Sequence, residues 1–343
     1  MQKIIAEIHL GNIRQNAKLF KEISGARLCA VVKADAYGHG AEEVAFSLAD
    51  IADCFAVALV DEGLAIRHAS CGKDILVFSS PITEAECYAI AVNGFIATIP
   101  DLQTAKLLSR VCKKYALTVR AHLKVNTGMN RYGMDLSELK TVCEFLAKNP
   151  FVQVEGIYSH LYDTDEKTAS GQRAFFTRAI AECKRHFSSF IAHLSATYGA
   201  TLGQSYAFDM VRVGLGLYGY SPVKTDLPLR KAMQVKAQVA CNRRYTFGGV
   251  GYGKAVAEEG ENIFLLRGGY ADGFLRTKEN GTDGAEQNAN NLCMDSCLRK
   301  GDKQRGEWVY LLTDAEKTAA ATGTIPYEVL CAATRRAERI YYH

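Results

Sequence analysis

The sequence predicts an α/β protein, a (β/α)8 barrel followed by a C-terminal, mostly antiparallel β domain. Short apolar runs alternate with helical patterns through the first two thirds of the chain. About eight such units in roughly 220 residues fit a closed barrel better than an open sheet, although a doubly wound sheet stays an alternative. After Pro222 polar and apolar residues alternate between glycine-rich turns, which is typical of antiparallel strands. We expect the barrel in residues 1–222 and the β domain in 223–343.

Many of the expected barrel strands are apolar on both faces, as parallel strands covered by helices should be. They are LCAVV (28–32), CFAVALV (54–60), DILVF (74–78), FIATI (95–99), VRAHLKV (119–125), VQVEGIYSH (152–160), FIAHLS (190–195) and FDMVRVG (208–214). Helical patterns occupy the intervals, at 11–23, 41–50, 101–115, 136–149 and 166–186. In the second region, 233–256 and 262–274 have the alternation of antiparallel strands, and 277–291 lack any large apolar residue, which predicts a mobile loop.

Composition excludes several classes of function. The net charge of +4, from 41 basic and 37 acidic residues, gives no reason to expect nucleic acid or an anionic membrane as a partner. No apolar run approaches the ~18 residues of a membrane helix. The N-terminal apolar stretch is too short for a signal peptide, because the acidic Glu7 interrupts it. The 11 cysteines are scattered without a C-x-x-C pair, so we expect buried thiols in a reducing cytoplasm and no metal site.

A glycine motif raises the question of a dinucleotide. Gly214, Gly216 and Gly219 match G-x-G-x-x-G. However, Pro222 follows too soon for a long helix, and no acidic residue stands about 20 positions on to hold a ribose. The motif also ends the alternating region instead of opening it. Glycines in the last βα loops of a barrel suit a phosphate bound by backbone N–H groups.

Charged and polar side chains gather where the barrel strands end, which is where barrel enzymes carry their chemistry. They are Lys33, Lys124, His160, Thr197 and Arg212. Any one of them could instead point outward into solvent, as lysines at a core edge often do. Lys33 directly follows an apolar strand, and a desolvated lysine can form a Schiff base. An amine for a carbonyl and a cradle for a phosphate together predict pyridoxal 5′-phosphate as the cofactor.

Six blocks, in order, resemble the alanine racemase family. They are AVVKADAYGHG (30–40), HLKVNTGMNRYGM (122–134), VRVGLGLYG (211–219), GYADG (269–273), CMD (293–295) and TIPYEVLC (324–331). The stretch VVKADAYGHG is a highly specific signature of the family. HLSATYG (193–199) is also similar to the alanine/serine racemase domains of vancomycin-resistance systems.

The resemblance implies a cofactor site and a dimer. Lys33 would hold pyridoxal phosphate as a Schiff base, and Arg212 would face the pyridine nitrogen. Tyr252 matches the second catalytic base, which in this family enters the site of the partner subunit together with Met294, so a homodimer with shared active sites is implied. The residues expected to hold the phosphate are Tyr37, Thr197, Gly214, Leu215 and Tyr327.

Further residues would support catalysis. Lys124 matches a lysine that is often carbamylated in the family and that positions the arginine matching Arg131. Racemisation needs a base on each face of Cα, and His160, next to Tyr252, would tune the acidity of that base as Arg212 tunes the ring. The residues expected at the entrance are Tyr270, Asp165 and Arg276. For Tyr270 and its neighbour Asp272, a role in shaping a turn stays open.

The family pattern predicts a D-alanine-forming racemase for peptidoglycan synthesis. Tyr327 leaves room for little more than a methyl group, which favours alanine over serine, and a serine or mixed racemase is the first alternative. A non-catalytic pyridoxal-phosphate carrier would lack the β domain and Tyr252, and a decarboxylase would need an acid in place of Arg212. Asn291 stands where the family has an entrance arginine, so the details of substrate access depart from the pattern.

Overall fold

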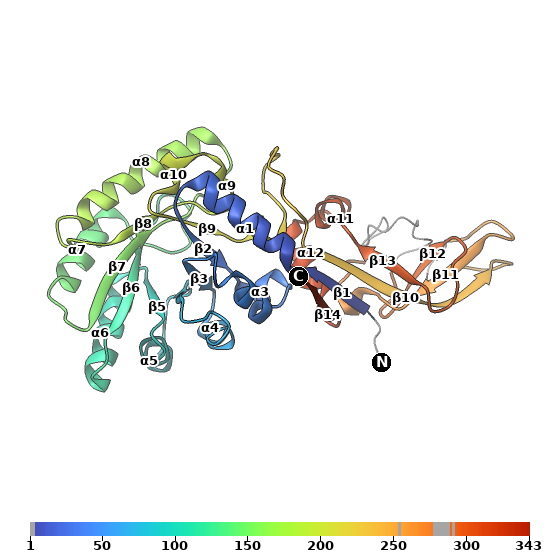
Figure 1. Ribbon diagram of the computed structural model, residues 1–343, viewed down its shortest axis with the longest axis horizontal. Coiled ribbons are helices and arrows are strands. Elements are labelled where there is room, and N and C mark those ends of the chain that lie inside the picture. Colours follow the sequence, from blue (N-terminus) through green and yellow to red (C-terminus); the bar gives the residue numbers. More distant parts are fainter. Residues whose placement is uncertain (1–3, 253–254, 277–288, 290–291) are drawn as a thin grey trace. The chain divides into compact units, whose positions relative to one another are not determined.

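The computed structural model describes residues 4–252, 255–276, 289 and 292–343 (Figure 1). The chain forms two compact units. The barrel unit comprises Arg14–Ala34 and Ala41–Leu229, and the β unit comprises Met1–Ile13, Asp35–Gly40 and Arg230–His343. Apart from residue 289, the segment 277–291 that we expected to be a mobile loop lies outside the described residues, as does Asn291.

The barrel unit contains an eight-stranded sheet in which every pair of neighbouring strands is parallel. The order is β8 (Ile191–His193), β7 (Val152–Tyr158), β6 (Val119–Lys124), β5 (Ile96–Ile99), β4 (Asp74–Val77), β3 (Cys54–Val57), β2 (Arg27–Val31) and β9 (Met210–Val213). The edge strands β8 and β9 are joined by backbone hydrogen bonds from Asp209 to Ala192 (3.0 Å) and from Arg212 to Ser195 (2.9 Å). The predicted (β/α)8 barrel is confirmed.

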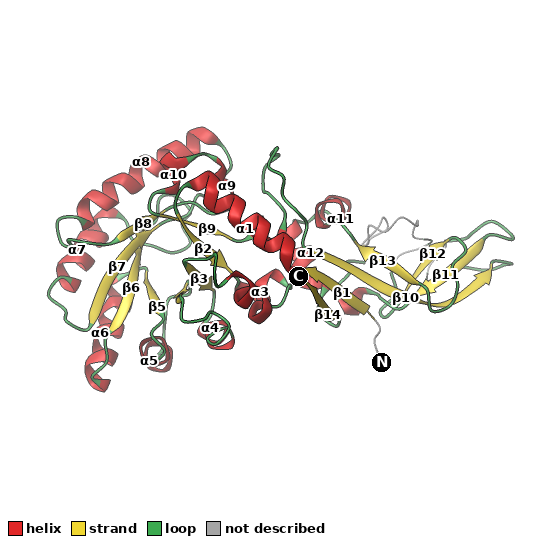
Figure 2. Cartoon of the chain, viewed as in Figure 1, coloured by secondary structure: helices red, strands yellow, loops and turns green. Residues whose placement is uncertain are grey.

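Helices lie outside these strands (Figure 2). They are α3 (Ala41–Leu48), α4 (Val60–Ala65), α5 (Glu84–Val92), α6 (Leu102–Tyr115), α7 (Leu136–Leu146), α8 (Glu166–Cys183), α9 (Thr197–Thr201) and α10 (Gln204–Ala207), with α1 (Leu10–Ser24) before them in the chain. Side-chain caps fix where several of them begin, because they satisfy N–H groups that a first helical turn leaves unpaired. Asp101, Asp135 and Asp165 cap α6, α7 and α8 in this way.

The β unit contains a six-stranded sheet of mostly antiparallel strands, as the alternation after Pro222 predicted. Its main path is β12 (Cys297–Lys300), β11 (Asn262–Leu266), β10 (Met233–Arg244), β1 (Ile4–His9) and β14 (Glu338–Tyr342), and β13 (Trp308–Leu312) pairs with β10. The helices α11 (Ala315–Thr322) and α12 (Pro326–Ala333) complete the unit. In β10 the alternate residues Met233, Val235, Ala237 and Val239 are buried.

The N-terminal strand β1 belongs to this sheet, although it comes before the barrel in the sequence. It runs antiparallel to β10 and parallel to β14. Residues 35–40 are also part of the β unit. The apolar run Ile4–His9 contains no sign of which sheet it joins, since strand pairing is decided by partners far along the chain.

Most of the cysteines are buried, as their apolar surroundings in the sequence predicted. All 11 cysteines are free, and seven of them are buried, whereas Cys71, Cys241 and Cys331 are exposed. In the described residues no helix is both long and apolar enough to cross a membrane. Likewise, the described residues contain no group of three or more His, Cys, Asp or Glu side chains placed to hold a metal ion.

Candidate active site

Lys33 follows β2, separated from it by Val32, at the carboxyl end of the barrel strands, and its side chain is half-buried. It opens a five-residue turn, α2 (Lys33–Tyr37), whose next four residues have φ between +51° and +55°, so the turn is left-handed. Such backbone costs about 1–2 kcal/mol for each residue that is not glycine, and it persists where surrounding contacts hold it. Here the carboxylate of Glu62 accepts hydrogen bonds from the backbone N–H groups of Ala34 and Ala58, both at 2.7 Å.

The end of this turn is fixed within the β unit. Arg339 forms an ion pair with Asp35 (2.5 Å) and donates to the carbonyl oxygen of Gly38 (2.8 Å). The rings of Tyr37 and Tyr327 lie 5.8 Å apart. Burial, with a smaller effect from Tyr327, raises the pKa of the Tyr37 phenol, which therefore stays a hydrogen-bond donor. Two of the expected phosphate ligands are thus neighbours.

Arg212 on β9 is 2% exposed and has only neutral hydrogen-bond acceptors. Its Nη1 donates to Nδ1 and to the carbonyl oxygen of His193, at 2.9 and 3.0 Å. Its Nη2 donates to the carbonyl oxygens of Ser159 (2.7 Å) and Leu194 (3.1 Å) and approaches Nδ1 of His160 (3.3 Å). These bonds occupy both terminal nitrogens, and no acceptor in the described part of the chain contacts Nε.

His160 follows β7 and is kept neutral by its surroundings. Burial lowers the pKa of its imidazole well below the usual value, and the positive charge of Arg212 adds to the effect. A neutral imidazole can accept a hydrogen bond through Nδ1, whereas an imidazolium cannot. The structure therefore brings His160 and Arg212 together. The sequence also predicted a contact between His160 and Tyr252, and that contact stays a prediction.

Lys124 is buried at the end of β6, with its Nζ 4.4 Å from the centre of the Tyr158 ring. Burial lowers the pKa of this amine far below 10.5, and the charges of Arg212 and Arg131 lower it further. Arg131 is exposed, in the segment that follows β6. As an ammonium, Lys124 would repel both arginines, whereas a carbamate on the same nitrogen would attract them.

A cradle of donors lies where β8 and β9 end. Gly214 precedes the short 3-10 helix η1 (Leu215–Tyr218), whose first N–H groups have no partner inside the helix. The hydroxyl oxygen of Thr197 accepts from the N–H of Gly216 at 3.1 Å, so Thr197 lies beside this turn. Gly216 itself is required for packing, because an added Cβ would lie 2.4 Å from the ring of Phe20.

Other expected site residues belong to the β unit and are exposed. Tyr252 is 73% exposed and Met294 is 54% exposed. The backbone carbonyl oxygens of Cys293 and Met294 accept from the N–H groups of Tyr270 (3.1 Å) and Ala271 (2.9 Å), so Met294 and Tyr270 are close. Arg276 is exposed as well.

Two acidic residues near the expected entrance have structural partners. Asp165, in the barrel unit, accepts from the N–H of Thr168 (2.8 Å) as the N-cap of α8. Asp272, in the β unit, is buried, accepts from the N–H of Gly269 (2.9 Å) and pairs with Arg336 (3.1 Å). The turn-shaping role left open for Asp272 is therefore the one that its contacts support.

Sequence reasoning missed three residues inside the barrel. His193 contacts Arg212, its ring stacks on Tyr158 at 4.9 Å and 1°, and its Nε2 lies 2.9 Å from Nδ1 of His122. A signal was present: His122 stands two residues before Lys124, so both side chains lie on the same face of β6. The contact between His122 and His193 spans 71 residues and could not be read from spacing.

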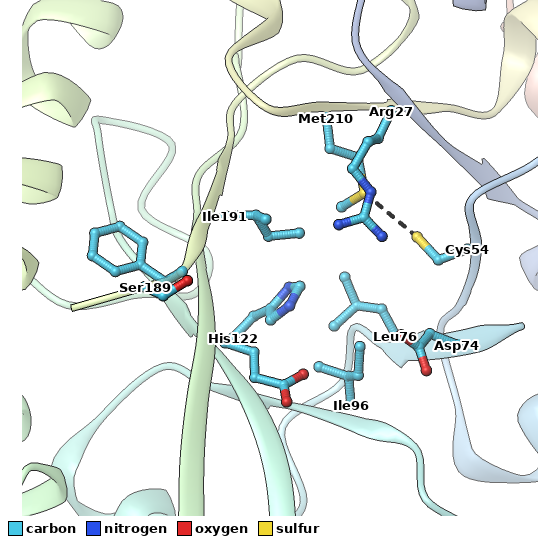
Figure 3. Close-up of a pocket in the computed structure, with 11 residues that line it drawn as sticks. Arg27, Cys54, Asp74, Leu76, Ile96, His122, Ser189, Ile191 and Met210 are labelled. Atoms are coloured by element: carbon cyan, nitrogen blue, oxygen red, sulfur yellow. Dashed lines mark hydrogen bonds between the residues drawn. The ribbon is translucent and has the colours of Figure 1, made fainter. Parts of the chain in front are cut away.

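A cavity of about 320 Å³ lies at the opposite, amino-terminal end of the barrel strands (Figure 3). Several of its lining residues are the first residues of strands, among them Arg27, Asp74 and Ile96. His122 also lines it, and Figure 3 shows its imidazole among Leu76, Ile96 and Ile191. The interior histidines therefore extend from the buried arginine toward the far end of the barrel.

A barrel with lysine, histidine and arginine side chains at its strand ends, joined in one chain to an antiparallel sheet, defines a class of two-domain barrel enzymes. Family models for the alanine racemase N-terminal domain and C-terminal domain match residues 8–222 and 232–341. The chain belongs to the alanine racemase family.

Relatives cover the chain almost completely. It is 31% identical to the alanine racemase of Desulfovibrio desulfuricans, covering 98% of this chain and 97% of that protein, and 32% identical to the one of Synechocystis, covering 99% of each. Among solved structures, the alanine racemase of Clostridium difficile 630 matches with a TM-score of 0.92 and 29% identity over 99% of this chain and 96% of that one. The alanine racemase of Bartonella henselae with covalently bound pyridoxal phosphate matches with a TM-score of 0.89 and 28% identity over the full length of both.

Proposed function

We propose that this protein is a pyridoxal-phosphate-dependent racemase that interconverts L- and D-alanine, with Lys33 and Tyr252 as its two bases. The observation that carries the proposal is the setting of Arg212. Its two terminal nitrogens are bonded to neutral acceptors, which leaves its Nε–H as a donor for the nitrogen of an aromatic ring. Because guanidinium hardly gives up its proton, a ring nitrogen facing it would remain an acceptor and so remain unprotonated.

Each chemical group of the cofactor would find suitable residues in this site. Lys33 offers the amine that a carbonyl cofactor requires, at the end of a barrel strand. A phosphate would find donors in the N–H groups of Gly214 and Leu215 and in hydroxyl groups. The hydroxyl donors are Thr197, Tyr37 and Tyr327. When bound, pyridoxal phosphate supplies an electron-withdrawing ring that makes the Cα–H of an attached amino acid acidic.

Racemisation needs one base on each face of the substrate. The amine of Lys33 would take or return the proton on one face and the phenol of Tyr252 on the other. His160, whose neutral imidazole contacts Arg212, would lie beside Tyr252 and lower the cost of ionising it. The exposure of Tyr252 and Met294 supports a homodimer in which each subunit supplies these residues to the other.

Arg212 would also control the fate of the reaction. By keeping the ring nitrogen unprotonated, Arg212 would weaken electron withdrawal from Cα and so favour return of the proton to Cα over transamination. Burial lowers the pKa of the Lys124 amine, which favours the neutral form that can add CO2. As a carbamate, Lys124 would orient Arg131 toward the substrate carboxylate.

Alanine is the proposed substrate because the ring of Tyr327, half-buried beside Tyr37, would leave little room beyond a methyl group. The D-alanine formed would serve peptidoglycan synthesis in the cytoplasm. Tyr270, Asp165 and Arg276 would line the entrance. Serine, with one more oxygen, would be a slower substrate of the same site.

The deciding experiment is to incubate the purified protein with L-alanine and, separately, with L-serine in D2O, following deuterium at Cα and optical rotation. We expect both signals with alanine and slower ones with serine. Absence of exchange with every small amino acid would contradict the racemase proposal, and faster serine turnover would make it a serine racemase. Lys33→Ala should abolish the near-visible absorption of the covalently held cofactor, whereas Lys140→Ala, on the exposed side of α7, should keep it.

A further inference from the structure

Three buried side chains form a hydrogen-bonded chain through the barrel. Nη1 of Arg212 lies 2.9 Å from Nδ1 of His193, and Nε2 of His193 lies 2.9 Å from Nδ1 of His122. The three residues come from β9, β8 and β6 and are between 0% and 2% exposed. This hydrogen-bonded chain starts with Arg212 at the carboxyl end of the strands and ends with His122 at the cavity on the other side of the barrel.

The chemistry of arginine gives this chain a direction. A guanidinium can only donate, so Nδ1 of His193 must be an acceptor and the proton of that imidazole must be on Nε2. That N–H then donates to Nδ1 of His122, which places the proton of His122 on Nε2 as well. Both imidazoles are neutral, since burial, assisted by the charge of Arg212, lowers the pKa of His193 far below 6.5 and that of His122 to about 3.

Packing holds the two rings in this arrangement. The ring of His193 is stacked against Tyr158, whose hydroxyl is hydrogen-bonded to Thr98 at 2.8 Å. His122 lies flat on Gly156 of β7, where an added Cβ would be only 2.5 Å from Cδ2 of the imidazole. The rings therefore have little freedom to turn, and the tautomers are set by which neighbours accept a proton.

We propose that His122 is a positioning residue that holds His193 in the Nε2–H tautomer and thereby orients Arg212. Without an acceptor at the place of His122 Nδ1, the N–H of His193 would be buried and unpaired. Moving that proton to Nδ1 would relieve this loss but would place a donor against the donors of Arg212. The first change would leave a buried donor unpaired, and the second would remove the Nδ1 acceptor from Nη1 of Arg212 and so loosen the guanidinium. The consequence for catalysis rests on the proposed function, in which Arg212 faces the cofactor ring.

The test compares three substitutions at one position. His122→Asn puts an amide oxygen where Nδ1 was and should preserve the chain, whereas His122→Leu and His122→Gln leave that place without an acceptor. The matched control is His186→Leu. His186 is a half-buried histidine that is hydrogen-bonded to Glu182 and takes no part in the hydrogen-bonded chain of Arg212, His193 and His122. Nitrogen-15 NMR of histidine-labelled protein without cofactor reports the tautomer of His193 directly.

We expect the Nε2–H tautomer of His193 in the wild type, in His122→Asn and in the control, and the Nδ1–H tautomer or a mixture in the other two variants. With cofactor, His122→Leu and His122→Gln should lower kcat for alanine by roughly tenfold and raise the share of transamination, with KM changed little. If His122→Leu does not fold, His122→Gln decides. A wild-type tautomer in the variants, or identical kinetics, would overturn the proposal. If the wild type shows the predicted tautomer but no racemisation, the proposed function fails and the positioning role survives.

Discussion

Gly156 of β7 and His122 of β6 fit against each other so closely that an added Cβ on the glycine would lie 2.5 Å from the imidazole. The register of β6 against β7 shifts between Ala121 and His122, at this same place. Gly156 is therefore a packing glycine, because the absence of a side chain there leaves room for the imidazole of His122.

The variant Gly156→Ala should destabilise the protein by about 1–3 kcal/mol, because the extra methyl group overpacks a buried ring. Chemical denaturation monitored by circular dichroism gives the change in free energy of unfolding. The matched control is Gly171→Ala in α8, where an added Cβ meets nothing within 4 Å. That substitution should stabilise the protein by up to ~1 kcal/mol, since alanine is the better helix former. Equal effects at the two sites would contradict the packing argument.

Reversing the charge at Arg212 tests why this residue is not an acid. In Arg212→Glu a carboxylate replaces the donor, so a ring nitrogen facing it would be protonated and would withdraw electrons more strongly. We expect transamination relative to racemisation to rise by roughly tenfold or more, measured as pyruvate formed per alanine inverted. The control is Arg178→Glu on the exposed surface of α8. An unchanged ratio in Arg212→Glu would refute the proposed role.

Lys124 should be carbamylated in the presence of bicarbonate, because burial lowers the pKa of its amine and so favours the neutral form that adds CO2. The resulting anion would also offset the buried positive charge of Arg212. Carbon-13 NMR with labelled bicarbonate should show a carbamate resonance that disappears in Lys124→Ala. The signal should persist in Lys140→Ala, whose amine is exposed beside Glu144. A signal retained in Lys124→Ala would assign the carbamate elsewhere.

The barrel and the ends of its strands could be read from the sequence for a simple reason. Many parallel strands are apolar on both faces, so a charged or polar residue at the end of an apolar run indicates the carboxyl end of a strand. Lys33, His160 and Arg212 stand at such ends, and parallel pairing brings these ends to one side of the barrel. Lys124 closes β6 in the same way.

Relations across the barrel could not be read in this way. That β1 joins the C-terminal sheet depends on pairing with residues more than 220 positions away, such as Ile4 with Ala237. The left-handed turn of Ala34–Tyr37 contains no glycine, the residue that usually indicates a positive φ in a sequence. The contact of His193 with His122 requires the closed barrel, because the sequence gives only the face of each strand on which a side chain lies.

Replacing Tyr252 by phenylalanine separates the two proposed bases. The phenol is 73% exposed in the single chain, so Tyr252→Phe should change the free energy of unfolding by less than ~0.5 kcal/mol. Racemisation should fall by a factor of roughly 10²–10⁴, the usual contribution of a general base. Because Lys33 still acts on its own face, exchange of Cα–H for deuterium should persist for one enantiomer of alanine only.

Tyr115→Phe is the matched control for this experiment, since Tyr115 is an exposed tyrosine packed against Tyr88 on the outer helices of the barrel. It should racemise alanine at the wild-type rate. Loss of deuterium exchange for both enantiomers in Tyr252→Phe would show that the phenol is not confined to one face.

The buried carboxylate of Glu7 should make the protein sensitive to acid. Burial alone would raise the pKa of Glu7, but hydrogen bonds from Lys236 (2.5 Å), Tyr310 (2.9 Å) and Tyr342 (3.3 Å) outweigh it and lower the pKa below 4.5. An acidic group whose pKa is lower in the folded state stabilises the fold at any pH above the pKa that the group has in the unfolded chain. This stabilisation is lost as the pH falls through the pKa of the folded state.

Glu7→Gln should therefore destabilise the protein near pH 7, with a difference from the wild type that shrinks below about pH 4. Denaturation across that range measures it, with Glu259→Gln, at an exposed site, as the neutral control. A difference independent of pH would mean that the shape of the side chain, and not its charge, is what β1 requires.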